Sequence, residues 1–200
     1  MDLNVEIPFI EKSKIKKEAD KIRAKAGVEG IPVNIEKIVE LHFRINIIPK
    51  PNMQNDCDVD ALIISDWNNI IVDKRMYDDE RYQTRLRFSL AHELGHFILH
   101  KKIWEKFNLK GVSDYEEFIE KIDINKYGAL ETQADMFANN ILVPRATLRG
   151  KRVEVISKID KKDVDKIDKE TLNEYIAIPL AKYFKVHETT IKIALDSLES

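Results

Sequence analysis

The sequence contains a single cysteine in 200 residues. One thiol cannot form an internal disulfide, so a disulfide-built fold is excluded. Asp56, Asp58 and Asp60 surround Cys57 in the sequence, and nearby carboxylates disfavour the reactive thiolate. We therefore interpret Cys57 as structural or incidental rather than as a catalytic nucleophile.

The chain also lacks an excess of charge of one sign. Lysine and arginine number 33 against 35 aspartates and glutamates, which gives a formal net charge of −2. A strongly basic domain would indicate a nucleic-acid partner, and this balance does not, so direct nucleic-acid binding is not expected. Apolar residues make up 44% of the chain, enough for the core of one domain, or of one domain with a small appendage.

Long hydrophobic runs are absent as well. No apolar stretch of the sequence approaches the length that a helix needs to cross a bilayer. The segment Met1 to Ile10 carries acids and no long apolar core, which argues against a signal peptide. We expect a soluble, cytoplasmic protein without a membrane partner. The sequence shows no internal repeat and no low-complexity tract.

Hydrophobic spacing in the first half of the chain predicts two helices and three short strands. One helix is expected over 11–26 and ends at Gly27, and a second begins near Asn34, a good N-cap. The three strands are bounded by turn residues, the first of them by Pro49, and the last two form a hairpin. They cover 43–48, 61–64 and 70–72.

The second half is expected to be mainly helical. The longest helix candidate spans 79–100, and it is apolar on so many sides that it must be a buried central helix. Another helix covers 127–142 and is stopped by Pro144. The remaining segments are a looser stretch, an exposed charged connector and two short helices, at 101–126, 151–170, 171–184 and 188–198.

The run His92-Glu93-Leu94-Gly95-His96 lies within the buried helix candidate. Positions i and i+4 share one helix face, so the two imidazoles can grip one zinc ion. Glu93 points toward the same side and can take a proton from an activated water as a general base. The alternative is two buried histidines satisfied by backbone carbonyls. The apolar, mid-helix setting favours the zinc site, because chance matches fall more often on exposed segments.

A catalytic zinc needs a third protein ligand and an open position for water. His100 lies two helical turns beyond His92, too far to converge easily on the same ion, and a supporting or packing role is expected for it. Glu131 and Asp135 are again i and i+4, so Glu131 can bind zinc while Asp135 accepts the outer N–H of a zinc-binding histidine. Two alternatives stay open: a solvent-facing acidic pair, and Asp135 as the ligand. Imidazole and carboxylate ligands favour Zn²⁺, with manganese, iron or cobalt as other occupants.

These segments resemble a known group of enzymes. Two histidines and a glutamate, with a Glu-x-x-Ala-Asp second motif, are similar to the gluzincin type of zinc peptidase. More narrowly, the sequence resembles the ImmA/IrrE family of zinc metallopeptidases. The resemblance rests on 87–96, continuing to His100, and on 131–138 with 141–144. It covers most of residues 30–150.

The departures from the family pattern are mild. Asn139 and Asn140 replace the small residues expected there, and Val143 stands where methionine is common. None of these positions is a proposed ligand, so the metal site is not put in doubt.

The resemblance implies a compact intracellular endopeptidase of the zincin type. We accordingly predict an α+β fold, in which a small, mostly antiparallel sheet packs beside the buried active-site helix, with helical segments at both ends. Residues 1–150 would form the zinc metallopeptidase domain and 151–200 a helical, helix-turn-helix-like segment. Members similar to this chain include regulators encoded by phages and mobile elements, which cleave or inactivate a helix-turn-helix repressor. The implied partner is therefore a protein substrate of that kind.

The mechanism expected of such a site uses Glu93 twice, first to accept a proton from water and then to pass it to the leaving amine. Stabilising the oxyanion needs another donor, and Tyr127 and His100 are the two candidates. The strand at 70–72 could pair with an extended substrate by strand addition.

Two readings compete with a peptidase. The run from Leu180 to Ile191 resembles a helix-turn-helix motif, which suggests a DNA-binding regulator. From Thr171 to Ser200, however, acids outnumber lysines, and no basic stripe is present to meet phosphate. The other reading is an inactive relative with a structural metal, which inactivates a repressor by binding alone. Three protein ligands rather than four favour the open, catalytic site.

Overall fold

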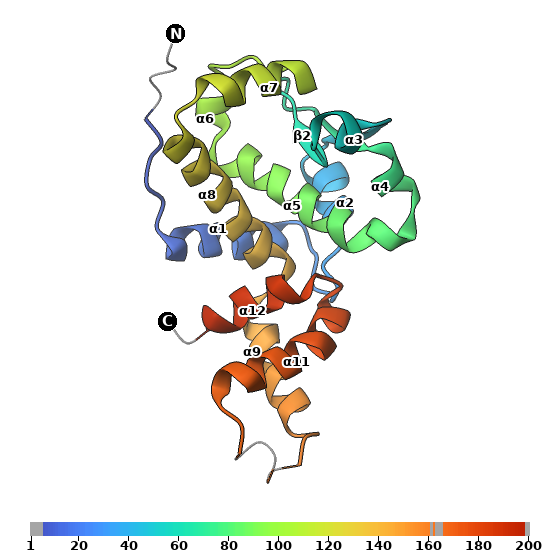
Figure 1. Ribbon diagram of the computed structural model, residues 1–200, viewed down its shortest axis with the longest axis vertical. Coiled ribbons are helices and arrows are strands. Elements are labelled where there is room, and N and C mark those ends of the chain that lie inside the picture. The colour runs from blue at the N-terminus through green and yellow to red at the C-terminus, as the bar shows by residue number, and fades with distance from the viewer. Residues whose placement is uncertain (1–5, 161, 163–165, 199–200) are drawn as a thin grey trace.

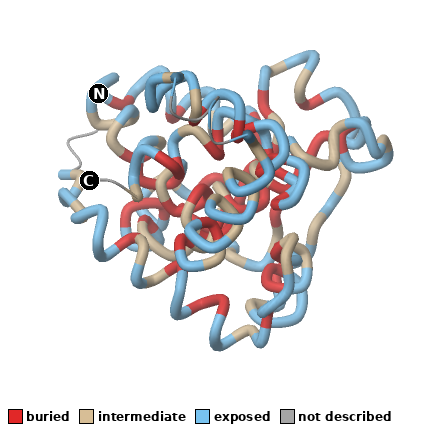
Figure 2. Tube along the Cα trace, turned by 90° about the horizontal axis from the view of Figure 1, so that it is seen from below, coloured by how far each residue is buried: buried red, intermediate tan, exposed pale blue. Residues whose placement is uncertain are grey.

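The computed structural model describes residues 6–160, 162 and 166–198. Residues 1–5 of the N-terminal segment, residues 161 and 163–165 of the predicted connector and the last two residues lie outside this range. Figure 1 shows an upper part of the molecule, built around α5, α8 and the sheet, and a lower part that consists of the helices α9, α11 and α12. Figure 2 shows the buried backbone gathered in the middle of the molecule.

The first helices follow the predicted pattern. Helix α1 spans Lys12–Lys25, and the apolar stripe of Ile15, Ala19 and Ile22 is buried. Helix α2 spans Ile35–Lys37, and the side chain of Asn34 caps it by accepting a hydrogen bond from the amide of Lys37. It continues into a π-helical turn, Ile38–His42.

The sheet has three strands, β1 (Asn46–Lys50), β2 (Ala61–Ile63) and β3 (Asn69–Asp73), in the order β1-β3-β2. The predicted hairpin is confirmed, because β2 pairs antiparallel with β3. Strand β1 pairs parallel with β3, so the sheet is mixed rather than mostly antiparallel. Turn residues fix the hairpin locally, but the side on which β1 joins is decided by packing far along the chain.

Two strand predictions need correction. Pro49 lies inside β1 and does not end it. This is tolerated because β1 is at an edge of the sheet, where a missing N–H need not break a ladder. Strand β3 lies between β1 and β2, so the residues 70–72 have neighbours on both sides and cannot accept a substrate strand. The edge open to an added strand on the hairpin side is β2.

Short helices connect the sheet to the centre of the fold. Helix α3 (Met53–Cys57) precedes β2, and α4 (Lys74–Asp78) and the 3-10 turn Glu80–Tyr82 follow β3. The predicted buried helix is α5, Gln83–Leu99. The stretch predicted to be loose contains two helices, α6 (Lys101–Trp104) and α7 (Val112–Lys121). That prediction was wrong for α7, whose apolar residues Val112 and Phe118 are buried.

Helix α8 spans Ile124–Leu142 and packs along α5. The two helices approach closely at Gly95, where an added Cβ would lie 3.1 Å from the Cα of Ala134 and 3.3 Å from the Cβ of Phe137. A glycine therefore sets the distance between the helices that carry the predicted histidines and carboxylates.

The lower part consists of α9 (Arg145–Ile156), α11 (Lys169–Phe184) and α12 (Glu188–Asp196). The two predicted C-terminal helices are confirmed, whereas residues 151–156, predicted as the start of an exposed, charged connector, belong to α9. One continuous cluster of buried apolar residues includes Ile15 of α1 and Leu195 of α12. The α+β prediction is confirmed. Among the described residues, no helix has the length and apolar character required to cross a membrane.

Candidate metal centre

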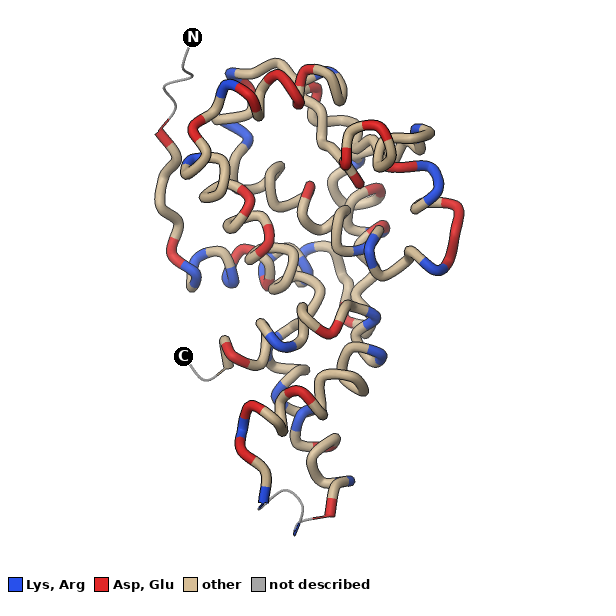
Figure 3. The backbone as a smooth tube through the Cα atoms, in the orientation of Figure 1, with Lys and Arg blue, Asp and Glu red and all other residues tan. Residues whose placement is uncertain are grey.

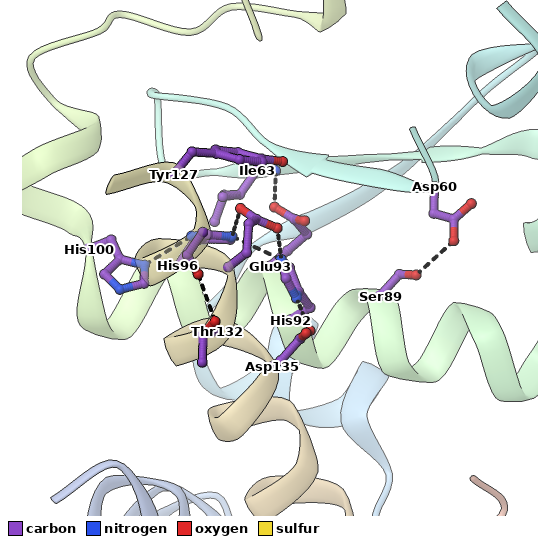
Figure 4. A network of polar contacts seen from close by, with 12 residues as sticks. Asp60, Ile63, Ser89, His92, Glu93, His96, His100, Tyr127, Thr132 and Asp135 are labelled. Atoms are coloured by element: carbon purple, nitrogen blue, oxygen red, sulfur yellow. Dashed lines mark hydrogen bonds and ion pairs between the residues drawn. The ribbon is translucent and has the colours of Figure 1, made fainter. Parts of the chain in front are cut away.

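Helices α5 and α8 bring the predicted metal ligands together. His92 and His96 lie one turn apart on α5, and Glu131 lies opposite them on α8. One ligand atom from each of the three side chains falls within 4.8 Å of the other two. Figure 4 shows His92 and His96 pointing from α5 toward α8, below the strand that carries Ile63. Residues that are far apart in the sequence thus form one three-donor cluster.

The inner nitrogen atoms of both rings face the Glu131 carboxylate. His92 Nε2 lies 3.2 Å from Glu131 Oε2, and His96 Nε2 lies 3.3 Å from Glu131 Oε1. The two Nε2 atoms are 2.9 Å apart. Two ring nitrogens and a carboxylate so close together require a cation among them, either a proton or a metal ion, because their lone pairs otherwise repel.

Asp135 contacts the outer side of the same cluster. Its Oδ1 lies 2.8 Å from Nδ1 of His92. A carboxylate can only accept this hydrogen bond, so the proton of the neutral His92 ring sits on Nδ1, which leaves Nε2 for a metal. This geometry favours Glu131 as the inner residue and Asp135 as the outer one, and it does not favour the exchanged roles.

The ionisation of the cluster reflects the same close approach. Burial opposes a charge on His92, but hydrogen bonds to Asp135 and Glu131 outweigh burial and raise the pKa of His92 to about 10. Burial likewise opposes a charge on Glu131, yet its contacts with His92 and His96 hold the pKa of that carboxyl well below its usual range. The cluster therefore holds a carboxylate and a positive charge even in the absence of metal.

The donor set suits a divalent zinc ion. Imidazole nitrogens and a carboxylate are common catalytic zinc ligands, and three of them leave a position open. Among the described residues, Glu131 Oε1 is a buried oxygen without a hydrogen-bond partner, although His96 Nε2 lies 3.3 Å away. A buried carboxylate oxygen with no donor is costly unless a cation meets it. The residues present therefore fit the metal that the sequence predicted.

Glu93 lies beside the cluster and is held by the sheet. The amide of Ile63 in β2 donates a 2.8 Å hydrogen bond to Glu93 Oε2, as Figure 4 shows. The side chain is buried, with 6% of the residue exposed. Burial raises the pKa of Glu93, with the His96 and His92 rings acting in the opposite direction. A carboxyl with a raised pKa next to a metal site is suited to accept and return a proton.

His100 lies behind the centre rather than in it. The residue is fully buried, with Nδ1 2.9 Å from Nδ1 of His96 and Nε2 3.0 Å from Oε1 of Gln133. Burial and the neighbouring His96 ring lower the pKa of His100 to about 3, so the ring is neutral. With both nitrogens occupied, His100 does not face the cleft, which argues against its predicted role as a transition-state donor.

Two residues that contact His100 or His96, Gln133 and Trp104, were not predicted from the sequence. Gln133 lies in the run from Glu131 to Asp135 but gave no signal of its own. Trp104 of α6 stacks on His96, with ring centroids 4.6 Å apart and an interplanar angle of 27°. The stack covers one face of a metal-site histidine with a fully buried aromatic ring.

The cluster opens into a cleft of about 520 Å³. Its walls come from α3, the segment leading into β2, α5, α7 and α8, and include Asp60, Phe88, Tyr115 and Tyr127. The hydroxyl groups of Tyr115 and Tyr127 lie 2.9 Å apart, and burial raises the pKa of both. Both phenols therefore keep their protons at neutral pH.

Tyr115 was missed because its segment was predicted to be loose. A usable signal was present, since Val112, Tyr115 and Phe118 recur at the spacing of one helix face. Cys57 also lines the cleft. Desolvation and the nearby Glu116 raise the pKa of its thiol, which agrees with the prediction that it is not a nucleophile.

Comparison with known proteins gives one assignment. No curated protein matches this sequence. A family model named Peptidase_M78, and described as the IrrE N-terminal-like domain, matches residues 76–196. This range contains the three clustered side chains, Glu93 and Asp135, and it extends through the C-terminal helices. The chain belongs to the IrrE N-terminal-like peptidase family.

Proposed function

We propose that this chain is a zinc-dependent endopeptidase, with His92, His96 and Glu131 as metal ligands and Glu93 as general base. The observation that carries the proposal is the convergence of three donor side chains, two of which, His92 and Glu131, line an open cleft, with the buried carboxyl of Glu93 beside them. Membership of a peptidase family supports a hydrolase that acts on protein. Three protein ligands leave a coordination position for water, as catalytic zinc sites do.

Zinc held by His92, His96 and Glu131 would supply Lewis acidity for the attacking water and the scissile carbonyl. Glu93 accepts the proton of the attacking water and passes it to the leaving amine. Its hydrogen bond from Ile63 holds one carboxylate oxygen, so the other oxygen is available for the proton. Asp135 orients the His92 ring through Nδ1.

Tyr127 is the better of the two donor candidates. Its side chain lines the cleft together with Glu93, whereas His100 is fully buried. A phenol whose pKa is raised keeps its proton and can donate it in a hydrogen bond to the oxyanion. Tyr115 lies within hydrogen-bond distance of Tyr127 and would orient that hydroxyl.

Substrate would bind in extended form along β2. Asp60 and Ile64 form backbone hydrogen bonds to β3. Because the groups of an antiparallel strand alternate in direction, the N–H and C=O of Ala61 point to the open edge. Ala61 also lines the cleft. A peptide added to this edge would run across the face of the metal cluster.

The identity of the substrate is a separate proposal. The resemblance to ImmA/IrrE proteins supports a helix-turn-helix repressor as the partner, in the cytoplasm of a host of phages or mobile elements. Inactivation of that repressor by binding alone, without cleavage, is the competing function of the same site.

Metal content per chain is the first test, in protein purified without added metal. We expect about one zinc ion per wild-type chain and a clear reduction in Glu131→Ala. Full occupancy in both proteins would move the third ligand elsewhere. No metal in either, even after zinc is added back, would leave His92 and His96 as core residues and refute the proposal.

Glu93→Gln then separates catalysis from binding. The amide keeps the shape of the side chain and an acceptor for Ile63, so zinc content should be unchanged while hydrolysis is lost. Normal cleavage by this variant would overturn the role of Glu93. Normal inactivation of a repressor without cleavage would support the binding function instead.

DNA binding through the C-terminal helices is not supported. Helix α12 carries one lysine and two acids, and Lys192 pairs with Glu174 of α11 at 3.0 Å. Figure 3 shows positive and negative residues mixed along these helices. A phosphate backbone requires a basic surface. A gel-shift assay with the full chain tests this directly, and salt-sensitive retardation of DNA would revive the regulator reading.

A further inference from the structure

A series of hydrogen bonds runs from the metal centre to the N-terminal segment of the chain. His96 Nδ1 contacts His100 Nδ1 at 2.9 Å, and His100 Nε2 contacts Gln133 Oε1 at 3.0 Å. Gln133 Nε2 then donates to the main-chain oxygen of Pro8 at 3.0 Å. The residues His96, His100 and Gln133 are 2%, 0% and 7% exposed, so water has little access to replace any of these contacts.

The Pro8 carbonyl fixes the direction of the series. A carbonyl oxygen can only accept a hydrogen bond, so the amide group of Gln133 must turn its NH₂ toward Pro8. Its oxygen atom then faces His100 and must accept there. The two nitrogens of the fully buried His100 ring meet an amide oxygen and another imidazole rather than a carboxylate, so burial keeps this ring neutral. It consequently carries its proton on Nε2 and presents a lone pair at Nδ1.

The lone pair of His100 in turn fixes the proton of His96. Since Nδ1 of His100 accepts, Nδ1 of His96 must donate. The Nε2 atom of His96 is then left as an acceptor, and it is the atom that faces His92 and Glu131. If the series ran the other way, an N–H of His96 would point into the centre and occupy the place of a metal bond.

We propose that His100 and Gln133 are positioning residues, which hold the proton of His96 on Nδ1 and keep Nε2 free for the metal. The inference rests on the metal centre proposed above. The two histidine ligands are thus oriented by different means. Asp135, whose side chain is 58% exposed, holds His92 with a charge, whereas neutral groups hold His96 in the interior, where an added charge would be costly.

The proton position can be observed without metal. Imidazole nitrogen shifts of ¹⁵N-histidine-labelled, zinc-free protein distinguish a protonated nitrogen from an unprotonated one. We expect His96 to be protonated at Nδ1, and His100 to be neutral and protonated at Nε2. A neutral His96 with its proton on Nε2, or a His100 with its proton on Nδ1, would overturn the proposal.

Zinc affinity gives the second readout, measured by competition with a chromophoric chelator. His100→Phe keeps the ring shape but cannot accept from His96, and its zinc affinity should fall roughly 10- to 100-fold. His100→Asn is the matched variant, because its side-chain oxygen can take the place of Nδ1 and should restore most of the affinity. Wild-type zinc affinity in folded His100→Phe would contradict the proposed roles of His100 and Gln133. So would a folded His100→Asn whose affinity is weakened as much as that of His100→Phe.

A second pair of variants tests Gln133. Gln133→Glu still accepts a hydrogen bond from His100, so the proton of His96 should remain on Nδ1. Gln133→Leu removes the acceptor, so the protons of His100 and His96 should no longer be confined to Nε2 and Nδ1, respectively. An unchanged nitrogen spectrum of His96 and His100 in Gln133→Leu would argue against the series. Circular dichroism establishes in each case that the variant is folded.

The experiments distinguish a failure of the hydrogen-bond series from a failure of the proposed metal centre. Glu131→Ala should lose zinc yet keep the proton of His96 on Nδ1, because the series does not pass through Glu131. If the wild-type chain binds no zinc, the proposed function is refuted, while the spectrum of the zinc-free protein still decides where the proton of His96 lies.

Discussion

The amide nitrogen of Ile63 lies 2.8 Å from Oε2 of Glu93, although the two residues are 30 positions apart in the sequence. A backbone group of the sheet edge therefore holds the candidate general base, and this donor cannot rotate away as a side chain could. The same strand offers the edge along which an extended substrate would bind. In the proposed function, one strand would thus position both the base and the substrate.

Loss of the hydrogen bond between Ile63 and Glu93 should lower the stability of the fold. Glu93→Ala leaves the buried N–H of Ile63 unpaired, whereas Glu93→Gln keeps an acceptor. In zinc-free protein we expect the alanine variant to be less stable than the glutamine variant by about 1–3 kcal/mol. Urea unfolding followed by circular dichroism measures the difference. Equal free energies of unfolding would show that the Ile63 contact does not stabilise the fold.

Asp135 should contribute to metal affinity without binding the metal. Asp135→Asn keeps an oxygen that can accept from His92 Nδ1 but removes the charge, and zinc affinity should fall roughly 10- to 100-fold. Glu120→Gln, on the exposed face of α7, removes a charge elsewhere and should leave the affinity unchanged. The prediction fails if chelator competition gives the same affinity for both variants.

Gly95 should be intolerant of even one added methyl group. In Gly95→Ala the new Cβ would meet the backbone of Ala134 at 3.1 Å, which forces α5 and α8 apart and should cost about 1–3 kcal/mol. Zinc affinity should fall as well, because the two helices carry the ligands. Thermal and urea unfolding of the zinc-free protein measure the first effect.

Gly128 provides the matched control on α8. A Cβ added there meets nothing within 4 Å, so Gly128→Ala should raise stability by about 0.5–1 kcal/mol through the better helix propensity of alanine. Stabilisation of Gly95→Ala to the same degree would contradict the close approach of the helices.

Tyr127 should affect turnover more than substrate binding. If its hydroxyl donates to the oxyanion, Tyr127→Phe should lower kcat about 10²- to 10³-fold with little change in KM. Tyr175→Phe, which alters an exposed residue of α11, serves as the control. A rise in KM with no change in kcat would instead indicate that Tyr127 helps to bind the substrate in its ground state.

The sequence predicted the local features of this molecule better than the distant ones. The spacing of His92 and His96 defines a helix face by itself, and the turn before Asn69 defines the hairpin. The parallel pairing of β1, by contrast, depends on contacts between segments that no local pattern connects. The inclusion of Pro49 in a strand follows from its place at a sheet edge, which the sequence does not reveal.

The candidate site shows the same division. Glu131 and Asp135 were predicted to lie near the histidines because their i, i+4 spacing matches that of the histidines, and the structure brings the four side chains together. Gln133 and Pro8 were not found, because their part in the structure depends on a hydrogen-bonded series across three segments of the chain. Trp104 was also missed, since a single aromatic residue in a short helix does not indicate which ring it covers.

The stacking of Trp104 on His96 gives the centre its own optical reporter. The indole lies in contact with a proposed ligand, and the chain contains only two tryptophans. In a Trp67→Phe background, the emission of this single fluorophore would follow the loading of the site directly. A metal with an open d shell, such as Co²⁺, would quench that emission, whereas Zn²⁺ would not, so occupancy could be titrated in solution without a substrate.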